Sequence, residues 1–154
     1  MFKWEIGRGE SRPFYLTISP NGDKDLIRLS REVIRSAPDL ENWEFYYFEP
    51  ARDWDRNFVL YDNNMDEQQI DASEWYVVAL TNQIGVTDLI LEASNIGHLD
   101  NDTAFMAADV VVITEIGEEN RILKIGDIEI VEQLDEEFTA QKAHIRELKY
   151  MLDL

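Results

Sequence analysis

The sequence predicts an α+β fold: a mostly antiparallel β-sheet with two or three helices packed on it as a two-layer sandwich. A β-rich segment, FYLTIS (14–19), runs into turn residues and then into apolar residues at helical spacing. Two more β-rich segments, WYVVAL (75–80) and VTDLILEA (86–93), flank a short connection with Gly and predict an antiparallel hairpin. No linker or repeat divides the 154 residues, so we expect a single domain over 1–154.

The first half of the chain is predicted to contain a strand, a helix and two more strands. The strand 14–19 ends at Pro20, and PNGD (20–23) is typical of a turn before a helix. WEFYYF (43–48) and NFVLYD (57–62) are predicted strands. The helix is predicted from Asp23 to Pro38, since Pro disfavours helix at the residue before it. Its apolar residues at helical spacing are Leu26, Ile27, Leu29, Val33, Ile34 and Ala37.

The second half is predicted to contain the hairpin, a helix and a further strand. HLDNDT (98–103) supplies helix-capping residues, and Gly117 is a natural C-terminal cap. The β-branched run VVVIT (110–114) also fits a buried strand, and that alternative stays open. IGDIEIVE (125–132) alternates apolar with polar residues and is predicted to be the last strand. The apolar residues at helical intervals between these caps are Phe105, Ala108, Val112 and Ile116.

The C-terminus is predicted to be a helix over 134–153. Its apolar positions step by four, three, four, three and four residues, the spacing of a narrow helical seam. This seam consists of Leu134, Phe138, Gln141, Ile145, Leu148 and Leu152. We expect Ile145 to be buried, because such a stripe must cover the domain's own sheet or a second copy. Docking on the domain is favoured, and a homodimer that exchanges this end is the alternative.

The segment ISPNGDKDLIRLSREVIRSAPDLENWEFYYFEP (18–50) combines an Ile-Ser strand end, a Gly turn, a helix closing in Ala-Pro, and Leu-x-x-Trp before an aromatic strand. In these features it resembles a family of uncharacterised small bacterial α+β proteins. TEIGEEN (114–120) is similar to a Leu-Gly-Glu element of the same group. The resemblance covers about a quarter of the chain. It implies a bacterial origin and an α+β fold, and it transfers no activity or catalytic residue.

The amino-acid composition limits the cellular compartments and the kinds of partner that we expect for this protein. Cysteine is absent, which excludes thiolate catalysis, disulfides and zinc sites built on sulfur. No apolar run approaches the roughly 18 residues that cross a bilayer, and the N-terminus lacks a signal-peptide pattern. We therefore expect a cytoplasmic protein with no membrane partner. The net charge of −18, from 14 Lys and Arg against 32 Asp and Glu, opposes nucleic-acid binding. This acidity serves solubility or, alternatively, steers a basic protein partner.

One segment begins like a calcium-binding loop. DNNMDEQQID (62–71) has oxygen-bearing side chains at alternate positions, but Glu67 and Ser73 stand where the motif needs Gly and Glu. The preceding residues are strand-like where the motif needs a helix. We therefore expect a solvated polar loop or a short helical turn. The four residues that give the segment its likeness to a calcium loop are Asp62, Asn64, Asp66 and Gln68.

Catalytic motifs are equally incomplete. His98 lies in a turn and His144 in the predicted terminal helix, and neither belongs to an H-E-x-x-H sequence. No G-x-S-x-G elbow or phosphate-binding loop is present. Among 32 acids some carboxylates will lie at glycosidase-like separations by abundance alone. We expect no catalytic residue, no cofactor and no metal ion.

Two sets of residues are candidates for a partner surface. Eight of the 17 aromatic residues lie between Trp43 and Tyr61; they either pack in a sheet covered on both faces or form a partly exposed contact surface. Four basic residues step along the first helix, opposite its apolar face. They are either solvated and paired with acids such as Glu32, or a docking stripe for an acidic segment, including one from a second copy. The candidate surface residues are Tyr46, Phe48, Trp54, Tyr61, Lys24, Arg28, Arg31 and Arg35.

The function that these observations favour is a non-enzymatic, acidic protein-binding domain, with immunity- or antitoxin-like neutralisation of a basic protein as its sharpest form. One alternative is a small-ligand-binding protein or carboxylate-dependent enzyme with an aromatic pocket, which a deep cavity would favour. Another is a homo-oligomeric structural module built on the terminal helix. A flat acidic surface would favour partner binding.

Overall fold

The computed structural model describes all 154 residues and confirms the α+β class. Four of its six strand pairings are antiparallel, and the strands form three sheets where we expected one. The strands are β1 (Lys3–Gly7), β2 (Phe14–Ser19), β3 (Trp43–Tyr46), β4 (Asn57–Tyr61), β5 (Glu67–Asp71), β6 (Tyr76–Thr81), β7 (Thr87–Glu92), β8 (Ile125–Val131) and β9 (Ala143–His144). The helices are α1 (Ile27–Arg35), α2 (Asn101–Ile116), α3 (Glu118–Lys124), α4 (Glu136–Thr139) and α5 (Leu148–Met151), with 3₁₀ turns η1 (Lys24–Leu26) and η2 (Ile145–Glu147).

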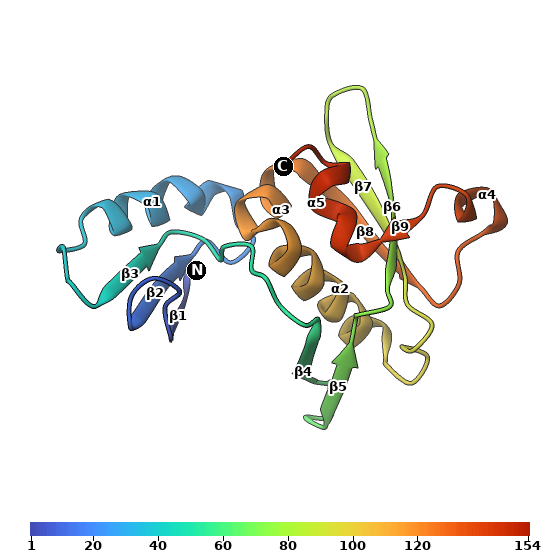
Figure 1. Cartoon of the computed structure of the whole chain (residues 1–154), viewed down its shortest axis with the longest axis horizontal. Helices are drawn as coiled ribbons and strands as arrows, with labels where there is room; N and C mark the ends of the chain where they lie inside the picture. Colours follow the sequence, from blue (N-terminus) through green and yellow to red (C-terminus); the bar gives the residue numbers. More distant parts are fainter.

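Strands β1, β2 and β3 and helix α1 form a lobe at one end of the molecule, which we call the N-terminal lobe (Figure 1). Strand β2 and the following helix confirm the prediction. The Asp23 carboxylate accepts a hydrogen bond from the backbone N–H of Asp25, which starts the helical segment. Strand β3 ends at Tyr46, two residues before its predicted end. Strand β1, which pairs antiparallel with β2, was not predicted.

Strands β4 and β5 form a separate antiparallel hairpin between the two larger parts of the molecule. Strand β4 confirms the prediction, whereas β5 was predicted to be a polar loop or a helical turn. The register pairs Phe58 with Ile70, so the two apolar side chains face the core together. This pairing outweighs the low β-propensity of the polar residues around Ile70.

The largest sheet has the strand order β8-β7-β6-β9 and carries the core. The predicted hairpin of β6 and β7 is confirmed, and β8 lies parallel to β7. Helix α2 packs on β8, and α5 packs on α2, so helices and sheet form two layers. Asp100 caps α2 by accepting from the Thr103 N–H at 2.8 Å, and Gly117 ends it with a φ of 84°. The alternative of a strand over 110–114 is therefore wrong, because burial against the sheet outweighs β-branching there.

The predicted helix over 134–153 is wrong, and β8 is not the last strand. The segment is divided into α4, the short strand β9, η2 and α5. Leu134 donates its N–H to Glu92, which lies on the opposite face of β7 from the core residue Leu91. Ile145 and Leu148 lie in the core on the other face of the sheet. The chain thus passes from one face of the sheet to the other at β9. Leu134 and Ile145, which have the spacing of one helical seam, therefore contact different faces of the sheet.

The predicted burial of Ile145 is confirmed, since none of its surface is exposed. The alternative of a homodimer that exchanges this end of the chain stays a prediction, although the long helix expected there does not form. Strand β9 pairs with β6 of the same chain, and the Ile145 N–H bonds to the Trp75 carbonyl at 3.0 Å. The terminal segment therefore belongs to the domain's own core.

The main core lies between the large sheet and helices α2 and α5. Its largest side chain is Trp75, which is 1% exposed and donates its indole N–H to the Asn95 side chain at 2.9 Å. Helix α3, which was not predicted, follows α2 directly after Gly117. None of the helices combines the length and the apolar character that a membrane-spanning helix needs.

Candidate functional site

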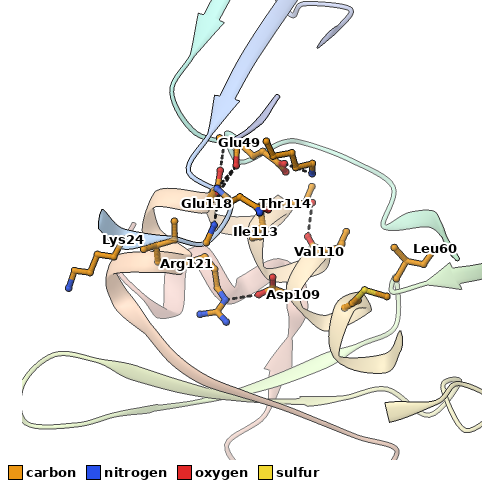
Figure 2. Close-up of a pocket in the computed structure, with 15 residues that line it drawn as sticks. Lys24, Glu49, Leu60, Asp109, Val110, Ile113, Thr114, Glu118 and Arg121 are labelled. Atoms are coloured by element: carbon orange, nitrogen blue, oxygen red, sulfur yellow. Dashed lines mark hydrogen bonds and ion pairs between the residues drawn. The ribbon is translucent and has the colours of Figure 1, made fainter. Parts of the chain in front are cut away.

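A cavity of about 530 Å³ lies where the N-terminal lobe meets α2 and α3 (Figure 2). Its polar lining comes from the ends of β1 and β2, the turn after β2 and the two helices. No aromatic ring lines it. The five apolar lining residues are Leu60, Met106, Val110, Ile113 and Ile122.

Glu118 is the central acid of this cavity and is only 3% exposed. Its carboxylate accepts hydrogen bonds from the Ser19 hydroxyl at 2.7 Å, the Glu49 N–H at 2.9 Å and the Gly22 N–H at 3.3 Å. Figure 2 shows these bonds joining the β2 turn, the segment after β3 and the start of α3. Gly117 permits this geometry, because its φ of 84° is unfavourable for other residues.

The other charged groups of the cavity also bind one another. Lys3 Nζ lies 2.8 Å from Glu49 Oε1, a contact that raises the pKa of Lys3. Arg121 Nε lies 2.7 Å from Asp109 Oδ1. Lys24 is the one lining cation without an ion pair. Every carboxylate that lines the cavity is therefore engaged in holding the fold, and no free carboxylate pair is left for general acid–base chemistry.

A second buried acid, Glu115, fixes the loop that follows the N-terminal lobe. Its side chain is 6% exposed and lies 2.7 Å from Arg56 Nε, and it accepts the Trp54 indole N–H at 3.0 Å. The sequence reasoning missed both Glu115 and Glu118 as structural groups. The available signal was two acids flanking Gly117 at the end of an otherwise apolar helix, which is unusual because buried acids require partners.

The four candidate aromatic residues do not share one exposed surface. Tyr46 donates its hydroxyl to Glu44 at 2.7 Å, Phe48 packs edge-on against the Tyr47 ring, and Trp54 packs against the core. These three are half-buried. Tyr61 is 56% exposed, on the outward face of β4.

The basic residues of α1 and η1 do lie together. Lys24, Arg28, Arg31 and Arg35 line a shallow concave surface of about 520 Å³ along with Ile27, Glu32 and Leu123. Arg28 pairs with Glu32 at 3.0 Å, the interaction expected one turn along a helix. Arg31 pairs with Glu119 at 2.7 Å and lies 4.8 Å from the centre of the Tyr47 ring. Lys24 and Arg35 have no ion-pair partner.

The segment 62–71 forms the turn and second strand of the β4–β5 hairpin. Asp62 Oδ1 accepts the N–H groups of Asn64 at 2.8 Å and Asp66 at 3.0 Å, and Asp62 Oδ2 accepts from Gln68 Nε2 at 2.9 Å. The carboxylate therefore points at the turn itself. No group of three or more His, Asp or Glu side chains is arranged to hold a metal ion.

Both histidines occupy positions with no catalytic partner. His144 Nε2 lies 2.6 Å from the Ser73 carbonyl oxygen, and its Nδ1 accepts the Arg146 N–H at 3.2 Å. The first contact ties β9 to the loop before β6, and the second caps the 3₁₀ turn η2. His98 is exposed in the loop before α2.

The β4–β5 turn, whose hairpin projects from between the two larger parts of the molecule (Figure 1), and the first turn of α2 form an acidic region, which we call the acidic pole. Asn63 Nδ2 lies 3.3 Å from carboxylate oxygens of both Asp100 and Asp102, which joins the two segments. Backbone N–H donors hold the pKa of Asp62 and Asp100 below their usual values, so both stay ionised. The residues of the acidic pole are Asp62, Asp66, Glu67, Asp100 and Asp102, with the exposed apolar side chains Tyr61, Met65 and Phe105.

Charge is distributed unevenly along the chain and therefore over the molecule. Residues 57–120, which include the acidic pole, contain 13 Asp and Glu and no Lys or Arg. Eight of the 14 basic side chains form ion pairs, which leaves 24 carboxylates without one. The excess negative charge is thus not neutralised by the chain's own bases.

A scan against protein-family models, a search of curated proteins and a search of solved structures each found no match.

Proposed function

We propose that this chain is a non-enzymatic, acidic domain that binds a basic protein partner. The observation that carries the proposal is the acidic pole, where five carboxylates and three exposed apolar side chains lie on two adjoining segments and no base lies nearby in sequence. Met65 is 76% exposed and Tyr61 56%, in a region whose charge already repels like-charged molecules. Protein interfaces combine such aromatic and Met contacts with complementary charge.

The chemistry of the cavity supports binding over catalysis. Glu118, Glu49 and Asp109 each hold another group of the fold, so none is available to a substrate without loss of a structural bond. The cavity also lacks the aromatic lining that the alternative of an aromatic ligand pocket requires. In its most specific form, the proposal is that the protein is bacterial and cytoplasmic and that it neutralises a toxin-like basic protein. The repulsion between these carboxylates and phosphates argues against nucleic acid as the partner.

The test uses the tagged chain to recover proteins at low salt from the cells that make it. Each recovered protein is purified and titrated against the chain in 0.05 M and 0.3 M salt. We expect a partner with positive net charge whose affinity falls by at least about tenfold over this range, because screening weakens attraction between opposite charges.

Two double variants that lose the same charge distinguish binding at the acidic pole from a general effect of the chain's negative charge. Asp66→Asn/Glu67→Gln alters carboxylates that make no side-chain bond in the fold, whereas Glu136→Gln/Glu137→Gln alters exposed acids on α4. The first should weaken binding much more than the second. Equal effects of the two, affinity that is indifferent to salt, or a partner with negative charge would each overturn the proposal.

A further inference from the structure

The N-terminal lobe leaves apolar side chains uncovered. Trp4 is 67% exposed, Ile6 54% and Phe14 46%, and on α1 Leu29 is 47% and Val33 48% exposed. Single exposed apolar residues are ordinary, but a group of them in one small unit marks an interaction surface.

The strand register places the first three on one face of the sheet. Trp4 lies opposite Ile18 and Ile6 opposite Leu16, and directly opposed residues share a face. Phe14, Leu16 and Ile18 alternate along β2 and so point the same way. This face is apolar along its whole length.

Helix α1 lies on this apolar face. The opposite face is occupied, because Arg52 lies 4.9 Å from the centre of the Tyr15 ring and Glu118 binds Ser19. Helix α1 contacts β2, so it must cover the side of Leu16 and Ile18. Figure 1 shows α1 running along the lobe beside the strands.

Helix α1 covers this face unevenly. Arg31 lies on the flank of α1 that contacts Tyr47 and Glu119, on the side of β3. At 100° per residue, Leu29 and Val33 lie on the other flank, toward β1. Their exposure shows that nothing in this chain covers the region between α1 and β1.

Strand β1 adds a free edge to this uncovered region. It is the outermost strand in the order β1-β2-β3, so the backbone groups on its outer side have no partner strand. Such edges are templates for pairing with another strand, and proteins protect them with charges or prolines. The two charged residues of β1, Lys3 and Glu5, both point away from the apolar face, so the side of the edge that carries Trp4 and Ile6 has no charge.

The charge of the N-terminal lobe indicates which molecule covers the exposed apolar region between α1 and β1. Residues 1–56 contain nine Lys and Arg against 11 Asp and Glu, whereas residues 57–154 contain five against 21. Two copies of a chain with net charge −18 repel one another. The N-terminal lobe is the end at which they meet with the least repulsion.

We propose that two copies of this chain associate through antiparallel pairing of their β1 strands. A two-fold axis at Trp4 sets the tryptophans of the copies opposite one another and Phe2 opposite Ile6 of the second copy. The same register sets Lys3 opposite Glu5 of the second copy, twice, so no like charges oppose one another across the joined strands. The two sheets become one of six strands, and Leu29 and Val33 of each copy flank the joined apolar face.

Sedimentation velocity over about 1 to 200 µM protein tests this proposal. The wild type should show a concentration-dependent dimer that strengthens between about 0.1 and 0.5 M salt, because screening removes the repulsion between copies. Binding of a basic partner at the acidic pole should weaken over the same range, so the two associations are distinguishable by the sign of their salt dependence. Failure of one leaves the other intact, since they use different residues on different sheets.

Matched variants locate the contact. Ile6→Glu should weaken the dimer at least about tenfold, whereas Ile84→Glu, at an 84% exposed position in the β6–β7 turn, should not. Both changes put the same charge at an exposed isoleucine, so circular dichroism and melting should confirm that both variants fold. A monomer at every concentration and salt, or a dimer that Ile6→Glu leaves unchanged, would overturn the proposal.

Discussion

The hydroxyl of Ser19 donates to the Glu118 carboxylate at 2.7 Å, a bond between residues 99 positions apart in the chain. It links the end of β2 to the start of α3, and the N–H groups of Gly22 and Glu49 bind the same carboxylate. One buried side chain therefore joins three segments at the junction of the N-terminal lobe and the helices. The stability of that junction should depend on it.

We expect Glu118→Ala to lower the free energy of unfolding by about 3 kcal/mol, because it leaves one hydroxyl and two N–H donors unpaired in a buried site. Glu118→Gln keeps one acceptor oxygen and should cost less. The measurement is urea unfolding, and the control is Glu119→Ala, whose partly exposed ion pair with Arg31 should contribute less than about 1 kcal/mol. Equal losses at the two positions would contradict a special role for Glu118.

The sequence predicts best where local chemistry sets the boundary of an element. Asp100 and Gly117 mark the ends of α2, and Pro20 marks the end of β2, since caps and prolines act within a few residues of themselves. The β6–β7 hairpin also follows from local alternation and a short turn. Strand β5 was missed because only its pairing partner in β4 makes polar residues a strand.

The predictions that were wrong concern residues whose structure is set by contacts with residues far away in the sequence. Leu134 and Ile145 have the spacing of one helix, yet each binds a different face of the sheet, and spacing alone carries no information on which face. The same holds for the candidate site. The basic residues of η1 and α1 could be predicted from helical periodicity, and they do line one concave surface. The buried positions of Glu115 and Glu118 depend instead on partners far away in the sequence. No local signal gives those partners.

The pH dependence of stability should contain a contribution from Glu44. The Tyr46 hydroxyl, together with Ser11 and Arg12 donors, lowers the Glu44 pKa from 4.5 to about 2. A lowered pKa in the folded state gives stability that is present above about pH 4.5 and is lost as the pH falls toward 2. The difference in melting temperature between the wild type and Glu44→Gln should therefore be constant near neutral pH and should disappear as the pH falls toward 2.

The matched control for Glu44 is Glu41→Gln, an exposed acid of the same region. Tyr46→Phe should reproduce part of the Glu44→Gln effect, because it removes the largest cause of the shift. Melting curves between about pH 2 and 7 provide the measurement. A gap for Glu44→Gln that persists unchanged at pH 2 would mean that the carboxylate's charge is not what stabilises this loop.

Calcium should not bind tightly at residues 62–71. Asp62 already accepts the N–H groups of Asn64 and Asp66, and the loop lacks the Gly and Glu of the calcium motif. Titration calorimetry should detect no micromolar calcium binding. Asp62→Ala should instead lower the melting temperature, because it removes the acceptor that closes the hairpin turn. A micromolar affinity that Asp62→Ala abolishes would show that the segment is a metal site.

The melting temperature should rise with sodium chloride. The net charge of −18 leaves 24 carboxylates without an ion pair, and their mutual repulsion destabilises the compact state. Raising the salt from 0.1 M to 1 M shortens the Debye length from about 10 Å to about 3 Å, which screens this repulsion. The measurement is a melt at each salt concentration. A flat or falling curve would mean that the eight ion pairs outweigh the global repulsion.

The last prediction concerns Ile145, which is fully buried in the core although it lies in no long helix. Its N–H bonds to the Trp75 carbonyl, and its side chain packs in the cluster that contains Trp75 and Leu148. Ile145→Ala should lower the free energy of unfolding by about 2 to 4 kcal/mol, through lost apolar burial and the cavity left behind. The control is Tyr150→Ala in the same terminal segment, which is 76% exposed and should cost less than about 0.5 kcal/mol.

Protein concentration separates two explanations of an Ile145 effect. If Ile145 packs only within its own domain, its loss is the same at every protein concentration in urea unfolding. If it packed in an interface formed by an exchanged C-terminus, the melt would depend on concentration and the variant would remove that dependence. The β1 pairing proposed for the N-terminal lobe does not involve Ile145, so Ile6→Glu provides a monomeric background for the comparison. A loss below about 0.5 kcal/mol in that background would mean that the terminal segment is not part of the core.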